Sequence, residues 1–216
     1  MVTFRIFIPC FTLFLLSFTS SLAQASSTGK NVVALTSYIA SSAIFDRTTT
    51  KSDIDLVDSI FVQALRIADG NISEALAACT WTCLPVRTAT IISPIIGYPL
   101  VIPFISADDS SFLEKNKRLP RYLFPDSPKS HSGDVDKLAH FFGTAYIEYN
   151  SFIPGVTRFF GVFIEVFEES FKVDSKFSVR DIDVNSLGIK FGDGLKKKTD
   201  LLPSQFLKEH ITTNKE

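Results

Sequence analysis

The chain has 216 residues, with 22 basic and 23 acidic side chains, a net charge of −1 and 45% hydrophobic residues. Because lysine and arginine are not in excess, the composition argues against a nucleic-acid-binding protein, which needs an extended basic face to neutralise phosphates. The length is sufficient for one domain with a sizeable core.

Residues 1–25 are predicted to be a signal peptide. They contain one positive charge, Arg5, no acid, and a long apolar run that ends in the small residues Ala23 and Ala25. This order of features is typical of a cleaved secretory leader. An uncleaved membrane anchor is the alternative, but the polar residues that follow favour cleavage. We therefore expect an exported protein, either periplasmic or membrane-associated.

Residues 26–106 are predicted to form an N-terminal helical region. The segment 52–69 has Ser52 as a candidate N-cap, acidic residues in its first turn and apolar residues at helical spacing, which predicts an amphipathic helix. A second, shorter helix is expected from Ser73 to the residue before Pro85, because proline cannot continue a helix.

Two cysteines, Cys79 and Cys83, lie in this second helix, in the sequence CTWTC. Outside the cytoplasm a disulfide is allowed, and a spacing of four places both on one helix face, although an undistorted helix is a poor host for the bond. Two small buried thiols are the other interpretation, and the sequence leaves both open. A metal site is less favoured, since no second cysteine pair or nearby histidine completes a four-ligand set.

The segment 88–105 is apolar and almost long enough to cross a bilayer. Pro94, Gly97, Pro99 and Pro103 would interrupt a simple helix repeatedly. We therefore expect a buried or membrane-associated irregular hairpin rather than a regular span.

The C-terminal half is predicted to contain a helical motif region at 133–198, preceded by a charged, proline-containing linker at 107–132 and followed by a polar tail at 199–216. Three helices are expected in the motif region, at 134–150, 154–171 and 178–197. Together these elements predict a mainly α protein: a small helical bundle with a Pro-rich apolar hairpin, forming a single compact domain after the signal peptide.

Each of the three helices carries polar residues four positions apart, which share a helix face. The pairs are Asp136 and His140, Glu165 and Glu169, and Asp181 and Asn185, and Lys137 lies beside the first pair. The last row continues through Gly188 and Gly192, which remove side-chain bulk and allow another helix to approach. Buried polar groups need partners, because an unpaired one costs roughly 1 to 3 kcal/mol. We expect a polar network that links the helices.

The combination of DKxxHF at 136–141, the acidic cluster at 165–169 and SxxDxxxNxxG at 178–188 resembles a bacterial family. It is similar to the YfiM-like predicted periplasmic lipoproteins of unknown function, whose pattern also resembles that of VanZ-like membrane proteins. The resemblance implies a small, mostly helical envelope domain. On the matching positions it points to Asp136, Lys137, His140, Glu165, Asp181 and Asn185.

The leading functional hypothesis is an exported cell-envelope protein with a structural or interaction role, whose partner is a membrane surface or another envelope protein. The sequence assigns no catalytic residue and no cofactor. The alternative is a metal-dependent hydrolase acting on an envelope lipid or glycan, with Asp136, His140, Glu165, Glu169 and Asp181 as candidate ligands. A single histidine and the adjacent charge of Lys137 count against that site. A general base at His140, oriented by Asp136, is the third possibility, but no nucleophile stands in a recognisable elbow.

Overall fold

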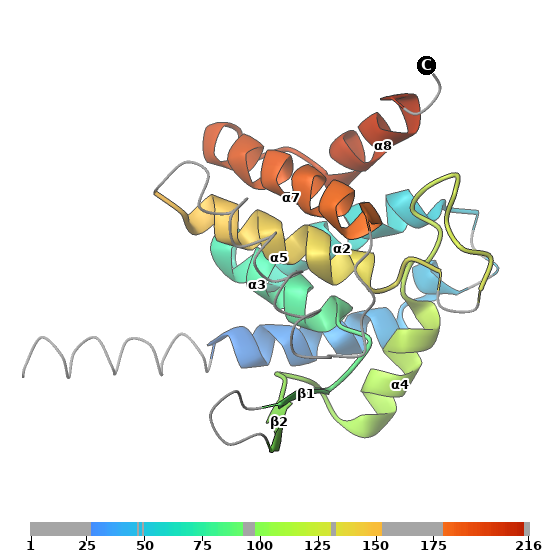
Figure 1. Ribbon diagram of the computed structural model, residues 1–216, viewed down its shortest axis with the longest axis vertical. Helices are drawn as coiled ribbons and strands as arrows, with labels where there is room; N and C mark the ends of the chain where they lie inside the picture. The colour runs from blue at the N-terminus through green and yellow to red at the C-terminus, as the bar shows by residue number, and fades with distance from the viewer. Residues whose placement is uncertain are drawn as a thin grey trace, which may run out of the picture.

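The computed structural model describes residues 27–46, 48, 50–92, 98–130, 133–152 and 179–213. In these ranges the chain is a mainly helical single domain with seven α-helices and one small antiparallel hairpin (Figure 1). After a helix at 27–41, the elements are η1 (Ala43–Phe45), α2 (Asp53–Ile67), α3 (Ile72–Cys83), β1 (Thr88–Ile92), β2 (Pro99–Pro103), α4 (Asp109–Arg118), α5 (Lys137–Asn150), α7 (Val179–Lys197) and α8 (Pro203–Thr213). The predicted leader at 1–25 and the predicted helix at 154–171 lie outside the described residues.

The first two helices predicted from the sequence are confirmed. Helix α2 begins after Ser52, whose side chain accepts a hydrogen bond from the Asp55 backbone N–H, as an N-cap does. Helix α3 begins one residue earlier than expected, because Asn71 acts as its N-cap by accepting a hydrogen bond from the Glu74 N–H. None of the helices in the described ranges has the length and hydrophobicity needed to span a membrane.

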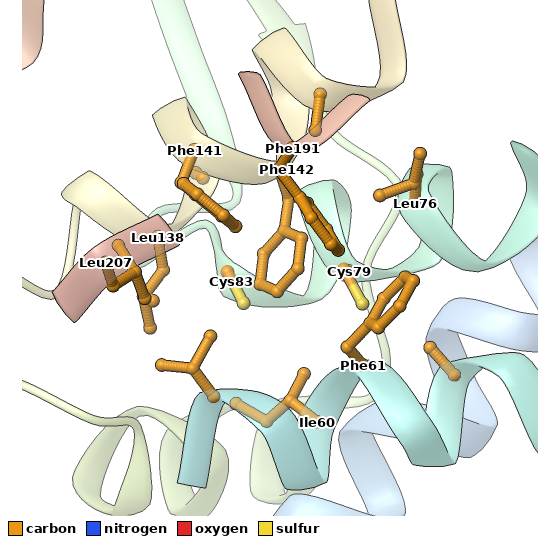
Figure 2. Close-up of a cluster of buried hydrophobic side chains, with 14 of the residues drawn as sticks. Ile60, Phe61, Leu76, Cys79, Cys83, Leu138, Phe141, Phe142, Phe191 and Leu207 are labelled. Atoms are coloured by element: carbon orange, nitrogen blue, oxygen red, sulfur yellow. The ribbon is translucent and has the colours of Figure 1, made fainter. Parts of the chain in front are cut away.

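The helices stack in the order α7, α5, α3 and the helix at 27–41, with α2 packed against α3 and α8 (Figure 1). Aromatic side chains from α2, α5 and α7 meet in the core (Figure 2). Phe61 of α2, Phe141 and Phe142 of α5 and Phe191 of α7 are fully buried, and their rings contact one another at centroid distances of 5.1 to 6.3 Å. Such ring pairs stabilise the core beyond the area they bury. This core fixes the positions of α5 and α7.

Cys79 and Cys83 are both free thiols buried in this core. The structure therefore shows two small buried thiols rather than a disulfide, the other possibility that the sequence left open. Burial raises the pKa of Cys83 to about 12 and raises that of Cys79 well above its usual range. Both groups are therefore neutral at physiological pH and pack as small apolar side chains among the phenylalanines (Figure 2).

The structure differs from the sequence prediction over the expected linker at 107–132, which contains α4. The side chain of Lys115 in α4 is buried, and its Nζ donates to the carbonyl oxygens of Thr82 and Leu84, both at 2.8 Å. These carbonyls belong to the end of α3, where backbone acceptors lack intrahelical partners. The side chain that α4 buries most deeply is therefore a lysine rather than an apolar residue.

The buried ammonium predicts a pH-dependent stability. Burial lowers the pKa of Lys115 from 10.5 to about 8. Above pH 8 the unfolded chain binds more protons at this group than the folded one, so its contribution to stability rises with pH up to 10.5. Between pH 8 and 9.5 the free energy of unfolding should rise by about 1 to 2 kcal/mol more in the parent protein than in the Lys115→Met variant. Denaturant unfolding under reducing conditions measures this difference. If the free energies of unfolding of the two proteins changed with pH in parallel, the predicted effect of Lys115 would be contradicted.

The region expected to be a polar tail, at 199–216, contains α8, which packs against α2. Leu207 is fully buried, and the Ser204 N–H in the first turn donates to Asp58 Oδ1 of α2 at 2.8 Å. Two local features of the sequence are typical of a helix start here. Pro203 occupies the first helical position, and the Gln205 side chain accepts a hydrogen bond from the Leu202 N–H.

The apolar segment forms a regular antiparallel hairpin in its described part, whereas the sequence predicted an irregular and buried or membrane-associated one. The Cα partners run from Thr88 opposite Pro103 to Ile92 opposite Pro99. The hairpin lies at the opposite end of the molecule from α8 (Figure 1), and Tyr98 and Val101 are 71% and 64% exposed. Pro94 and Gly97 lie outside the described residues.

Candidate functional site

Three of the predicted motif residues meet at the start of α5, where Lys137 lies between the carboxylates of Asp136 and Asp181. Its Nζ is 2.6 Å from Asp136 Oδ2 and 2.6 Å from Asp181 Oδ1 on α7. Lys137 and Asp181 are buried, at 8% and 6% exposure, while Asp136 is partly exposed. The contact between Lys137 and Asp181 is an ion pair that joins α5 to α7. Burial acts to lower the pKa of Lys137, but its contacts with Asp136 and Asp181 outweigh burial and raise that pKa.

A second ion pair lies directly beside the first. Arg180 precedes Asp181 on α7, and its Nη2 donates to Oδ1 of the fully buried Asp134 at 2.8 Å. The other oxygen of Asp134 accepts a hydrogen bond from Ser127, and Arg180 also pairs with Asp126 at 2.9 Å. Burial raises the pKa of Asp134, although these partners oppose the shift. Two consecutive residues of α7, Arg180 and Asp181, thus pair with Asp134 just before α5 and with Lys137 at its start.

Asp134 itself is positioned by the loop that precedes it. Its N–H donates to the Arg121 carbonyl at 2.7 Å, and the Arg121 N–H in turn donates to Asp53 Oδ2 of α2. Gly133 has φ +55°, in the left-handed region that favours glycine, and a Cβ there would lie 2.4 Å from the Arg121 carbonyl oxygen. This turn explains why α5 begins at Lys137, three residues after the predicted start at 134.

A third ion pair joins the other ends of the same two helices. Lys196 Nζ of α7 is 2.9 Å from Glu148 Oε1 of α5 and also donates to the Ser151 carbonyl at 3.0 Å. Since the starts of α5 and α7 are joined to each other and so are their ends, the two helices run parallel. We call the ion pairs Lys137–Asp181, Arg180–Asp134 and Lys196–Glu148 the α5–α7 junction. Asp181 near the N-terminus and Lys196 near the C-terminus also suit the dipole of α7.

The glycine row lies between these ion pairs and lets the two backbones come close. A Cβ at Gly188 would lie 2.2 Å from Thr144 Oγ1 and 2.3 Å from the Phe141 carbonyl oxygen. A Cβ at Gly192 would lie 2.5 Å from the Ala145 carbonyl oxygen. Neither position has room for a side chain, so the two glycines are required by the packing of α7 on α5, as the sequence predicts.

For two of the other predicted site residues, Asn185 and His140, the structure gives burial and position along a helix. Asn185 is buried one turn after Asp181, and His140 is partly buried one turn after Asp136. Glu165 and Glu169 lie outside the described residues. Asp134, Arg180, Glu148 and Lys196 were not singled out by sequence, because their partners are 46 and 48 positions away and no local spacing indicates them.

The arrangement favours charge neutralisation over ligand binding. Lys137 already supplies a cation between Asp136 and Asp181, so a metal ion could bind to both carboxylates only after the ammonium had moved. Within the described ranges, no group of three or more His, Cys, Asp or Glu is placed to hold a metal ion. The chemistry shown by these residues is that of paired, mostly buried charges.

Comparison with known proteins found no match for this chain among family models, curated proteins or solved structures.

Proposed function

We propose that the protein is an exported cell-envelope protein of the YfiM-like kind, with a structural or interaction role, in which the α5–α7 junction holds the helical domain in one arrangement. The observation that carries this proposal is the placement of Lys137 within 2.6 Å of both Asp136 and Asp181. All three are motif positions, and the ammonium of Lys137 offsets the charge of both carboxylates.

A structural role explains why charged residues lie in a helical contact. Breaking a buried ion pair leaves an uncompensated charge, so only the helix arrangement that preserves all three pairs avoids this cost. The ion pairs at both ends also select one register along the glycine row.

The experiment on export is fractionation of cells that produce the protein, followed by N-terminal sequencing. We expect the protein in the envelope fraction, beginning at Gln24 or Ser26, because Ala23 and Ala25 are the two candidate cleavage positions. A cytoplasmic protein that retains residues 1–25 would contradict the proposed export and leave the α5–α7 junction unaffected.

A further inference from the structure

The β1–β2 hairpin has two chemically different outer edges. The Phe104 N–H donates to the Arg87 carbonyl at 2.8 Å, which makes these residues a hydrogen-bonded pair at the base of the hairpin. Hydrogen-bonded and non-hydrogen-bonded pairs alternate along an antiparallel ladder. With the observed register, the pairs whose backbone groups point outward are Thr88 and Pro103, Thr90 and Val101, and Ile92 and Pro99.

The outer edge of β2 is closed to further strands. Of its three outward positions, Pro99 and Pro103 have no N–H, so Val101 alone can donate. Proline at such positions is a common protection against unwanted edge pairing.

The outer edge of β1 carries a full set of backbone donors and acceptors. Thr88, Thr90 and Ile92 each direct an N–H and a carbonyl outward, and in the described part of the chain β2 is the only strand that pairs with β1. Threonine and isoleucine favour extended structure. The two strands contact each other along the whole ladder, and a two-stranded sheet is marginally stable by itself. Within the described residues the hairpin therefore has one open edge, which no other strand pairs and which keeps all of its backbone donors.

We propose that β1 pairs antiparallel with β1 of a second copy of the chain, so that two hairpins form one four-stranded sheet in the order β2, β1, β1, β2. The open edge is self-complementary, because its three outward residues are symmetric about Thr90. In the dimer Thr90 faces Thr90 of the second copy across the twofold axis, and Thr88 faces Ile92. Cross-strand threonine pairs are favourable in sheets.

The charge distribution is compatible with this pairing, and the prolines limit it to two copies. From Thr88 to Ala107 the chain has no charged residue, so two hairpins can lie side by side without like-charge repulsion. Once the β1 edges are joined, the outer edges of the new sheet are both β2 edges, which the prolines close. The contact is isologous and ends at the dimer.

The test is the oligomeric state of the purified protein by sedimentation or light scattering over a range of concentrations. We expect a concentration-dependent dimer that the Thr90→Pro variant loses, because this change removes the outward N–H nearest the twofold axis. The matched control is Val101→Pro, which removes the outward N–H of β2 and should leave the dimer intact. Neither N–H is used within the hairpin, so both variants should keep the circular dichroism spectrum of the parent.

Two results of this test would overturn the proposal: a monomer at every concentration, or a dimer that Thr90→Pro does not weaken. Hydrogen exchange on the unchanged protein gives an independent readout. The Thr90 amide should be more protected at high than at low concentration, while the Val101 amide should exchange rapidly at both. Equal, concentration-independent exchange of the two amides would also overturn it.

Discussion

Lys137→Met should lower the free energy of unfolding by about 3 kcal/mol, because it leaves Asp181 buried without its cation. Methionine fills a similar volume, so the loss arises from charge rather than from a cavity. The raised pKa of Lys137 means that its contribution is fully present below pH 10.5 and is lost as the pH rises through the folded-state value. Urea unfolding at neutral pH therefore measures the whole effect.

The matched control for this change is Lys198→Met. Lys198 pairs with Asp200 at 3.5 Å, but both side chains are largely exposed, and exposed pairs contribute little. We expect a change within about 0.5 kcal/mol for this variant. Similar losses for Lys137→Met and Lys198→Met would show that burial of the first pair has no energetic consequence.

Gly188→Ala should destabilise the protein by about 2 to 3 kcal/mol, because the added methyl group overpacks the contact between α5 and α7. The new Cβ would overlap Thr144 Oγ1 and the Phe141 carbonyl oxygen. Rotation of the Thr144 side chain relieves the first overlap, but the second involves backbone and requires the helices to move apart. Thermal unfolding should show a lower midpoint, and Thr144→Ala should not restore it.

Gly29→Ala is the control for the intrinsic effect of the glycine-to-alanine change. Gly29 lies in the helix at 27–41, and a Cβ there would have no atom within 4 Å. Alanine is the better helix former, so this variant should be as stable as the parent or more stable by up to about 1 kcal/mol. If Gly188→Ala were equally harmless, the close approach of α5 and α7 would be refuted.

Local signals in the sequence predicted much of the helical fold. Ser52 followed by acids and a regular apolar spacing was enough to place α2, and the spacing of Gly188 and Gly192 was enough to predict a close helix contact. These predictions succeed because an N-cap, a helix face and a small-residue row depend on residues within a few positions of one another.

The remaining features depend on contacts between distant residues. Lys115 is polar, yet α4 packs through it, because the unpaired carbonyls at the end of α3 accept its hydrogen bonds. Asp134 and Arg180 are far apart in the sequence and carry no shared motif. The prolines of β2 suggested an irregular hairpin, but they occupy outward positions where a missing N–H leaves the ladder intact.

The central claim, that the α5–α7 junction is a structural ion-pair network, is tested most directly by a double-mutant cycle on Lys137 and Asp181. The variants are Lys137→Met, Asp181→Leu and the two combined, with unfolding free energies measured under one condition. We expect a coupling of roughly 2 kcal/mol or more, because removal of both charges avoids the cost of leaving one buried alone. Additive losses, with a coupling within about 0.5 kcal/mol of zero, would contradict the account.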